Sequence, residues 1–181
     1  MSGSVETARL RLRPLRLEDA SVVSTLMTPN VSRWVATWPS PFSIEAATER
    51  LGRAIAGNEA GTAFSRVAER KSDGAFMGWL GIAVMDEEKR IGSMGYWLGE
   101  PFHGQGYLTE ALPHFVAGAI AALRLNHLDA GAQVDNVASR AALERIGMRF
   151  VEERMDQTPI RPDPERCAFY RLDCMAFSPS R

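Results

Sequence analysis

Apolar and polar residues in the first third of the chain recur with the periods of one strand and two helices. Alternation over residues 10–14 predicts a strand with one polar face. Apolar residues at helical spacing follow over residues 17–27, and Pro29 ends that helix. Ser43 is a good N-cap, so a second helix is predicted over residues 44–56, after a loop rich in tryptophan and proline.

The middle of the chain predicts three strands and a long helix. The strands are expected at residues 64–69, 76–85 and 91–98, with polar turns between them. Gly92 and Gly95 lie inside the third of these strands, where glycine indicates a bulge or a close approach of backbone. The helix is expected over residues 107–124, because its apolar residues recur every three or four positions, and Pro113 is expected to kink it.

The last third predicts a strand, a short helix and two further strands. The strand is expected at residues 128–134, and the helix begins at Asn136 and stops at Gly147. The two final strands are expected at residues 148–154 and 167–177. The whole order of elements predicts a single α/β domain of the α+β type over residues 1–181, with a mixed sheet that helices cover.

Composition narrows the class of protein. A length of 181 residues suits one domain with a proper core, and 45% hydrophobic with 24% charged residues is typical of a globular protein. The formal net charge of −1 gives no reason to expect nucleic-acid binding. We find no apolar run of membrane-spanning length and no signal-peptide core at the start, so we expect no membrane partner and a cytoplasmic location.

The two cysteines support the same expectation. Cys167 and Cys174 are seven residues apart, so in one strand they point to opposite faces and cannot pair with each other. We expect both to be reduced and buried, which suits a cytoplasmic protein. No cysteine or histidine cluster has the spacing of metal ligands, so we expect no metal.

The most informative segment covers residues 96–110, where a strand, a glycine-bearing turn and a helix follow one another. Gly104 and Gly106 let the backbone approach a ligand closely, and the helix N-terminus adds unpaired N–H groups with a partial positive charge. Together these features predict an anion site suited to a pyrophosphate. The segment lacks the Gly-Lys-Ser/Thr of a P-loop, and Thr109 stands where a dinucleotide fingerprint needs glycine. Glycines that serve only a tight turn are the alternative.

Four blocks, in order and spanning residues 6–177, resemble the GNAT acyltransferase superfamily and its RimJ/RimL-like N-acetyltransferase branch. Residues 7–15 with Asp19 resemble the first strand and helix of that branch, and Gly-Tyr-Trp-Leu at 95–98 resembles its fourth strand. Gly-Gln-Gly-Tyr-Leu-Thr-Glu-Ala at 104–111 resembles its pyrophosphate loop. Residues 136–139 and 143–150 resemble its closing helix and strand.

The resemblance implies a mostly antiparallel sheet of about seven strands, with helices on both faces and a V-shaped splay between strands four and five. Acetyl-coenzyme A (acetyl-CoA) would be the co-substrate, and its pantetheine arm would lie in the splay. The strand backbone near Trp97, Leu98 and Gly99 would pair with that arm. The pyrophosphate would be held by backbone N–H groups of His103, Gly104, Gln105, Gly106, Tyr107, Leu108 and Thr109.

The chain departs from the family pattern at three positions. His103 stands where arginine or glutamine is usual, which implies less positive charge for the phosphates or an affinity that depends on pH. Leu108 stands where glycine or alanine is usual, but main-chain N–H groups carry most of the binding. Ser93 stands where the branch often has glutamate, so no carboxylate role is expected at that position.

Candidate catalytic residues follow from the same resemblance. Asn136 is a helix cap and also a candidate cofactor contact, and the two roles are compatible. Ser139 either fills the first helical turn or donates a hydrogen bond to the leaving thiolate, a role that suits a serine hydroxyl better than full proton transfer. Relatives often use a tyrosine there, and neither Tyr107 nor Tyr170 lies at that position.

The other side chains that we weighed are aromatic, acidic or histidine residues. Trp34, Trp38 and Phe42 either pack against the second helix or form a wall of the acceptor site. Candidate general bases by location alone are Glu69, Glu100, Glu152 and Glu153, although carboxylates at such positions are more often ordinary surface charges. We assign no base, and we expect His114 and His127 to be structural.

These observations predict an N-acetyltransferase that moves an acetyl group from acetyl-CoA to a primary amine by direct attack in a ternary complex. The acceptor is a protein N-terminus or a small-molecule amine, and the resemblance leaves a homodimer open. The first alternative is a non-catalytic acyl-CoA-binding or regulatory module. The second is a homodimeric structural partner with a decayed cofactor site, although Gly104, Gly106, Asn136 and Ser139 are all present.

Overall fold

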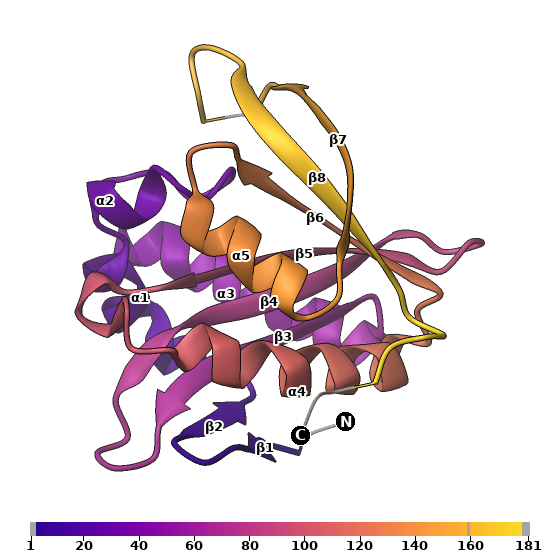
Figure 1. The fold of residues 1–181 in the computed structure, drawn as a ribbon. Helices are drawn as coiled ribbons and strands as arrows, with labels where there is room; N and C mark the ends of the chain where they lie inside the picture. The colour runs from indigo at the N-terminus through magenta and orange to yellow at the C-terminus, as the bar shows by residue number, and fades with distance from the viewer. Residues whose placement is uncertain (1–2, 159, 179–181) are drawn as a thin grey trace.

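The protein is built on one open sheet with helices on both of its faces (Figure 1). The computed structural model describes residues 3–158 and 160–178. In that part of the chain the eight strands follow the order β1-β2-β3-β4-β5-β6-β8-β7, and every neighbouring pair is antiparallel except β5 and β6. The strands are β1 (Val5–Glu6), β2 (Leu10–Arg13), β3 (Ala63–Arg70), β4 (Phe76–Asp86), β5 (Ile91–Leu98), β6 (His127–Gln133), β7 (Arg149–Asp156) and β8 (Glu165–Asp173).

The expected splay lies between β5 and β6. The two strands pair in parallel only from Ile91 with His127 to Met94 with Ala130. Beyond that point β5 continues to Leu98 and β6 to Gln133, so the two strand ends diverge. These are the fourth and fifth strands of the prediction. The eighth strand is β1, which has two residues and is too short to show a period of its own.

Two cores, one on each face of the sheet, hold the helices in place. The helices are α1 (Ala20–Leu26), α2 (Pro29–Ser32), α3 (Ile44–Ala60), α4 (Tyr107–Leu123) and α5 (Val137–Arg145), with short 3-10 turns η1 (Leu17–Asp19) and η2 (Glu100–Phe102). On one face Leu112 and Phe115 of α4 pack with Leu80 of β4. On the other face Leu51 of α3 packs with Trp79 of β4. Figure 1 shows α4 and α5 in front of the sheet and α3 behind it.

The helix boundaries differ from the prediction in two places. Helix α3 continues four residues past the predicted end and stops at Gly61, whose φ of 70° is the left-handed conformation that glycine favours. The predicted loop after Pro29 contains α2, because proline suits the first helical position and Thr28 caps it by accepting from Val31 N–H. Pro113 lies within a continuous α4, so the expected kink does not interrupt the helix.

The predicted roles of Gly92, Gly147 and the two cysteines are confirmed, whereas Gly95 pairs regularly with Gly81 and has open space beside it, so the prediction of a bulge or close approach there was wrong. The pairing of β4 with β5 shifts register between Val84 and Asp86, opposite Gly92, and a Cβ on Gly92 would lie 3.0 Å from side-chain atoms of Ile82 and Leu125. Gly147 ends α5 with a φ of 88°. Cys167 and Cys174 are both buried and free.

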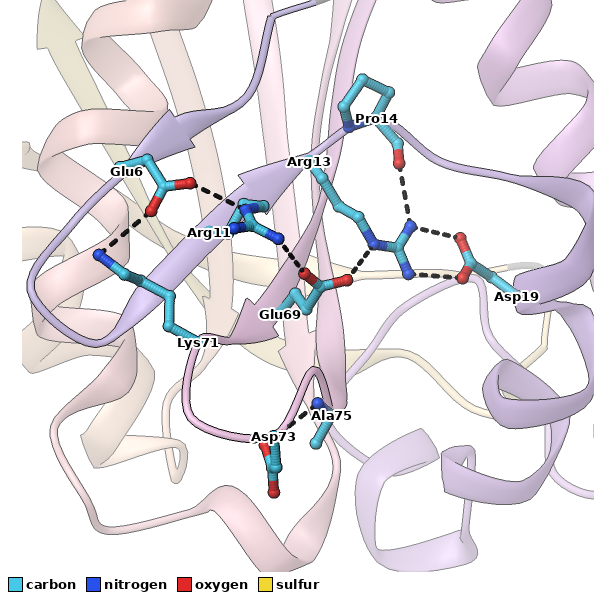
Figure 2. Close-up of polar contacts among 9 residues, drawn as sticks. All are labelled: Glu6, Arg11, Arg13, Pro14, Asp19, Glu69, Lys71, Asp73 and Ala75. Atoms are coloured by element: carbon cyan, nitrogen blue, oxygen red, sulfur yellow. Dashed lines mark hydrogen bonds and ion pairs between the residues drawn. The ribbon is translucent and has the colours of Figure 1, made fainter.

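An ion-pair network fastens β1 and β2 to β3 and to η1 (Figure 2). The Arg13 guanidinium donates to both carboxylate oxygens of Asp19, at 2.9 and 2.7 Å, and to Glu69 Oε2 at 2.6 Å. Arg11 joins Glu69 to Glu6 at the exposed end of the network. The side chains of Arg13 and Asp19 are each only 8% exposed, so this pair lies in the interior.

Replacing Arg13 with methionine should lower the free energy of unfolding by about 3–5 kcal/mol, because the buried Asp19 would lose its ion-pair partner and Glu69 would keep only Arg11. Replacing Arg53 with methionine is the control, since the Arg53–Glu49 pair is exposed and should contribute less than about 1 kcal/mol. Urea unfolding of both variants measures the difference. A loss below 1 kcal/mol for the Arg13 variant would contradict the structural role of the network.

Candidate active site

A cavity of about 1080 Å³ at the splay is lined by residues from both faces of the sheet. On the face that carries α4 it is lined by Tyr96, Leu98 and Ser139 together with residues of the loop before α4. On the face that carries α3 it is lined by Trp34, Trp38 and small residues of β3, β4 and β5. A single cavity therefore joins two surfaces that lie on opposite sides of the sheet.

The glycine loop, residues 103–106, has the backbone geometry that the sequence predicts. Gly104 and Gly106 have φ of 71° and 76°, and Gly106 is the N-cap of the 17-residue α4. The first N–H groups of an α-helix have no partner inside it, so those of Tyr107, Leu108 and Thr109 are available at the cavity wall. This helix end, with its partial positive charge, is suited to an anion.

Two predicted members of the glycine loop are oriented differently from expectation. The N–H of His103 donates to Glu100 O at 3.1 Å, and its Nε2 lies 2.8 Å from Leu98 O. Because a carbonyl oxygen only accepts hydrogen bonds, Nε2 carries the hydrogen. The imidazole therefore donates to the backbone of β5 and does not point toward an anion on the loop. Gln105 does not line the cavity, because its side-chain amide donates to Pro101 O.

A cation that the sequence analysis missed lies beneath the glycine loop. Arg9 donates to Gln105 O at 3.0 Å and to Glu110 Oε2 at 2.7 Å, and its guanidinium lies 4.4 Å from the centre of the Tyr107 ring. Burial raises the pKa of Glu110, but hydrogen bonds from Thr7 and Arg9 outweigh it, so the pKa is lowered overall. Arg9 therefore balances a carboxylate inside the anion site, and strand alternation alone gave no sign of this contact.

The end of β5 directs alternate backbone groups into the splay. Gly99 N–H donates to Met77 O at 2.8 Å, so Gly99 and, two residues earlier, Trp97 pair with β4. The backbone groups of Leu98 and Tyr96 consequently point toward β6. Of the three predicted strand positions only Leu98 faces the splay, and Tyr96 is the position that the prediction missed.

Three residues bring α5 to the same wall. Asn136 caps α5 by accepting from Ser139 N–H at 3.1 Å, which confirms the predicted cap. The Ser139 hydroxyl lies 3.0 Å from the hydroxyl of Tyr96, which comes from β5. Burial raises the pKa of Tyr96 to about 12. Tyr170, the other tyrosine near α5, bonds to Arg140 and does not line the cavity.

The comparison with protein families decides the class of this chain. Residues 9–149 match the family model described as an acetyltransferase (GNAT) domain. The chain belongs to the GNAT acetyltransferase family. It is therefore an acetyltransferase, and the resemblance that the four sequence blocks indicated is confirmed.

Related proteins agree with this assignment. The chain is 30% identical over 154 residues to YdaF of Bacillus subtilis (strain 168), which is provisionally named a ribosomal N-acetyltransferase; the match covers 80% of this chain and 79% of that protein. It is 26% identical over 147 residues to the uncharacterized N-acetyltransferase p20 of Bacillus licheniformis, covering 79% and 80%. Both matches extend over most of each protein.

Solved structures share the fold. RimL, a ribosomal L7/L12 α-N-protein acetyltransferase crystallised with coenzyme A, superimposes with a TM-score of 0.83 at 18% identity, over 94% of this chain and 98% of that one. RimJ of Mycobacterium smegmatis, in complex with CoA-disulfide, gives 0.82 at 22% identity, over 94% and 87%. At these identities the likeness establishes the fold, including the open, mostly antiparallel sheet.

On the α3 face, this GNAT chain has a floor of small residues. The sheet floor consists of Ala63, Ser65, Gly81, Ala83, Ser93 and Gly95, which pair across β3, β4 and β5. A Cβ on Gly95 would meet no atom within 4 Å, so the space above it is open. Arg50 and Arg53 of α3 stand at one side of the floor, and Phe169 and Cys167 of β8 stand at the other.

Two of the three predicted acceptor-site aromatics line the cavity. Trp34 lies at its edge, while Trp38 is buried with ring centres 5.0 Å from Trp79 and 5.4 Å from Trp97. Phe42 does not line the cavity; it packs behind Trp38 at 5.3 Å. The loop therefore does both things that the sequence predicted: Trp34 and Trp38 form part of the cavity wall, and Phe42 packs in the core.

The four carboxylates considered as bases do not line the cavity. Glu69 is bound to Arg13 and Arg11, Glu100 to Thr28 and Asn30, Glu152 to Arg154, and Glu153 to Arg166. Asp156 and Glu165, paired across β7 and β8, line it instead. Burial raises the pKa of the nearby Cys167, and the charges of Asp156 and Glu165 raise it further. Sequence position alone gave no hint of these two, because strand pairing brings them to the splay.

Three remaining expectations concern histidines, metals and membranes. Neither His114 nor His127 lines the cavity. Over residues 3–158 and 160–178 we find no group of three or more acidic, histidine or cysteine side chains arranged to hold a metal ion. In the same part of the chain no helix combines the length and apolarity needed to cross a membrane.

Proposed function

We propose that this enzyme transfers the acetyl group of acetyl-CoA to the α-amine of a polypeptide, by direct attack in a ternary complex in the cytoplasm. The observation that carries the proposal is the cavity at the splay. It joins an anion site at the start of α4 to an open floor of small residues on the other face. A donor and an acceptor can therefore approach the same point from opposite sides of the sheet.

In this proposal the pyrophosphate of acetyl-CoA lies on the N–H groups of Gly104 to Thr109, with Arg9 beneath them. The pantetheine arm runs between β5 and β6 and pairs with the backbone of Leu98 and Tyr96. Asn136 and Ser139 meet the thioester end. Structures titled as complexes of RimL with coenzyme A and of the acetyltransferase MccE with acetyl-CoA support this choice of co-substrate.

For this reaction the protein must position the two reactants, donate a hydrogen bond to the developing negative charge, and provide a path for one proton to leave. The amine nitrogen attacks the thioester carbon, the carbon–sulfur bond breaks, and its electron pair goes to sulfur. The Ser139 hydroxyl donates a hydrogen bond to the leaving thiolate. Asp156 and Glu165 attract the acceptor ammonium and accept its proton through water, a role that suits carboxylates at the cavity wall.

The sheet floor favours a polypeptide N-terminus over a compact amine. Of its six small residues, Ala83, Ser93 and Gly95 on β4 and β5 are exposed, and a Cβ on Gly95 would meet no atom within 4 Å, so an extended chain can lie over these two strands. The relatives named for ribosomal substrates point the same way. In this proposal residues 1–181 form a single acetyltransferase domain, and one chain supplies every site residue.

The test is acetyl transfer to peptides, read by mass spectrometry and by release of the free CoA thiol. A hexapeptide with a free serine N-terminus and an internal lysine should gain one acetyl group, on the α-amine. The same peptide with a blocked N-terminus is the control and should stay unmodified, because the lysine is not at the chain end. Binding of acetyl-CoA without transfer to any peptide or small amine would instead support the non-catalytic module.

A further inference from the structure

We infer that Tyr96 is a positioning residue of the acetyl-transfer reaction, which holds the Ser139 hydroxyl toward the sulfur of the leaving thiolate. The inference rests on the proposed function, since it needs a thioester in the splay. It assigns a role to the side chain of a β5 residue. Tyr96 acts through Ser139 in this arrangement.

The geometry starts from two hydroxyl groups that come from different elements. The Tyr96 hydroxyl lies 3.0 Å from Ser139 Oγ and 3.3 Å from Ser139 O, and the two residues are 43 positions apart in the chain. Both line the cavity, just past Met94 and Ala130, the last residues at which β5 and β6 pair. The pair therefore stands at the fork of the splay, where the thioester lies in the proposed complex.

The backbone of Ser139 is already fixed by another contact. Its N–H donates to Asn136 Oδ1 at 3.1 Å, within the first turn of α5. The hydroxyl of a serine still rotates freely about its side-chain bond, so one fixed neighbour decides where its hydrogen points. The single Tyr96 hydrogen can reach Ser139 O at 3.3 Å or Ser139 Oγ at 3.0 Å. In the inferred arrangement it points to the nearer Oγ, and the serine hydrogen is then left to point into the cavity, toward the sulfur.

The acid strengths decide between hydrogen bonding and proton transfer. Burial raises the pKa of Tyr96 to about 12, while an ordinary thiol has a pKa of about 8.5. A proton would therefore remain on tyrosine rather than pass to the thiolate. The pair stabilises the thiolate through two aligned hydrogen bonds, from Tyr96 to Ser139 and from Ser139 to sulfur.

The atoms and charges of the step balance without an additional reagent. The carbon–sulfur bond breaks with its electron pair on sulfur, and both hydroxyl protons stay on their own oxygens. The attacking nitrogen loses its surplus proton to water as the amide forms. The thiolate takes one proton back from water, so the products are the acetylated amine and the CoA thiol.

The test uses CoA itself, so it does not depend on knowing the acceptor. A site that stabilises the thiolate lowers the pKa of the bound thiol, so the affinity for CoA should rise with pH between the pKa of the bound thiol and that of the free thiol. We expect a rise of about tenfold between pH 6.5 and 9.5 for the unaltered protein, measured by calorimetry and expressed relative to acetyl-CoA. Acetyl-CoA has no thiol, so it corrects for every other group that titrates.

That correction matters because other titratable groups face the same cavity. They are His103, Tyr107, Asp156, Glu165 and Cys167, and the guanidinium groups of Arg50 and Arg53 add charge. Where these groups act on the shared phosphates and pantetheine, they change the affinities for acetyl-CoA and CoA alike. Only a group that interacts with the ionised sulfur changes the ratio of the two affinities.

Tyr96→Phe keeps the ring and its packing but removes the hydroxyl. In this variant the ratio of CoA affinity to acetyl-CoA affinity should rise less than threefold between pH 6.5 and 9.5. Tyr170→Phe is the matched control, because the Tyr170 hydroxyl also bonds to α5, through Arg140 and Glu144, but does not line the cavity. It should keep the tenfold rise. If Tyr170→Phe removes the rise as well, loosening of α5 explains the effect and the inference is wrong.

A second measurement separates positioning from direct catalysis. With the serine peptide as acceptor, Ser139→Ala should lower kcat by about 30-fold and Tyr96→Phe by about 10-fold, with the KM for acetyl-CoA within twofold. The double variant should match Ser139→Ala alone, because Tyr96 acts through that hydroxyl. The inference would be overturned if the losses of kcat in the two single variants add in the double variant. It would also be overturned if Tyr96→Phe keeps the full pH dependence of the ratio of CoA affinity to acetyl-CoA affinity. If the unaltered protein binds neither CoA nor acetyl-CoA, both the proposed function and this inference are wrong. If it binds both tightly but the ratio of the two affinities does not change with pH, only the role of Tyr96 is wrong.

Discussion

Replacing Gly106 with glutamate should weaken acetyl-CoA binding by at least about a hundredfold, or about 2.8 kcal/mol. Gly106 is the N-cap of α4 and lines the cavity, and a Cβ on it would lie 3.7 Å from Arg9 Nη2. The added carboxylate would therefore pair with Arg9 and place a negative charge beside the loop that holds the pyrophosphate in our proposal. A carboxylate about 4 Å from a phosphate charge is repelled by about 4 kcal/mol near a protein surface. Calorimetric titration of the purified variant with acetyl-CoA measures the loss.

Two matched variants separate charge from backbone strain. Gly106 has a φ of 76°, a conformation that costs a residue with a side chain roughly 1–2 kcal/mol. Gly61 has a φ of 70° and open space around it at the end of α3, so Gly61→Glu suffers the same strain away from the cavity and should keep its affinity. Gly106→Gln adds bulk without charge and should lose about tenfold. Equal affinity in Gly106→Glu and the unaltered protein would place the cofactor elsewhere.

Replacing Gly95 with leucine should abolish acetyl transfer while leaving acetyl-CoA binding intact. A Cβ there meets nothing within 4 Å, so the side chain fits the fold and fills the space above the sheet floor. The backbone of Gly95 pairs with Gly81 of β4, which leaves the splay-facing groups of β5 unaltered. We expect kcat/KM for the serine peptide to fall by more than about a hundredfold, with acetyl-CoA affinity within threefold.

Gly95→Ala is the control for this prediction, because a single methyl group leaves most of the space open. It should keep at least a third of the activity. Urea unfolding of both variants should agree with the unaltered protein within about 1 kcal/mol, since leucine and alanine are tolerated in a strand. Full peptide turnover by Gly95→Leu would show that the acceptor does not cross the sheet floor.

The elements themselves could be predicted from the sequence wherever a period ran long enough. The bounds of β5 were predicted to the residue, and α4 was predicted to within one residue. Strand β1, with two residues, and α2, with four, are too short to show a period. The splay could be expected only from the family resemblance, because local pattern carries no information on where two strands stop pairing.

The site was predicted in part, and its gaps have a common physical cause. Gly104, Gly106, Asn136 and Ser139 stand in motifs with local geometry, and the structure brings them to one cavity. Arg9 lies against the glycine loop and Tyr96 lines the cavity, and each is held by a partner, 96 and 43 residues away, that no local pattern encodes. The carboxylates show the same effect, since pairing of β7 with β8 places Asp156 and Glu165 at the wall.

The central claim is that acetyl-CoA binds across the splay, with its pyrophosphate on the start of α4. Amide hydrogen exchange of the unaltered protein, with and without saturating CoA, tests it most directly, because a bound backbone N–H exchanges more slowly. Our account predicts slower exchange at residues 96, 98 and 104–109 and at the start of α5, with little change in β1, β2 and β7. Slowing at another surface, with unchanged rates over residues 104–109, would contradict it.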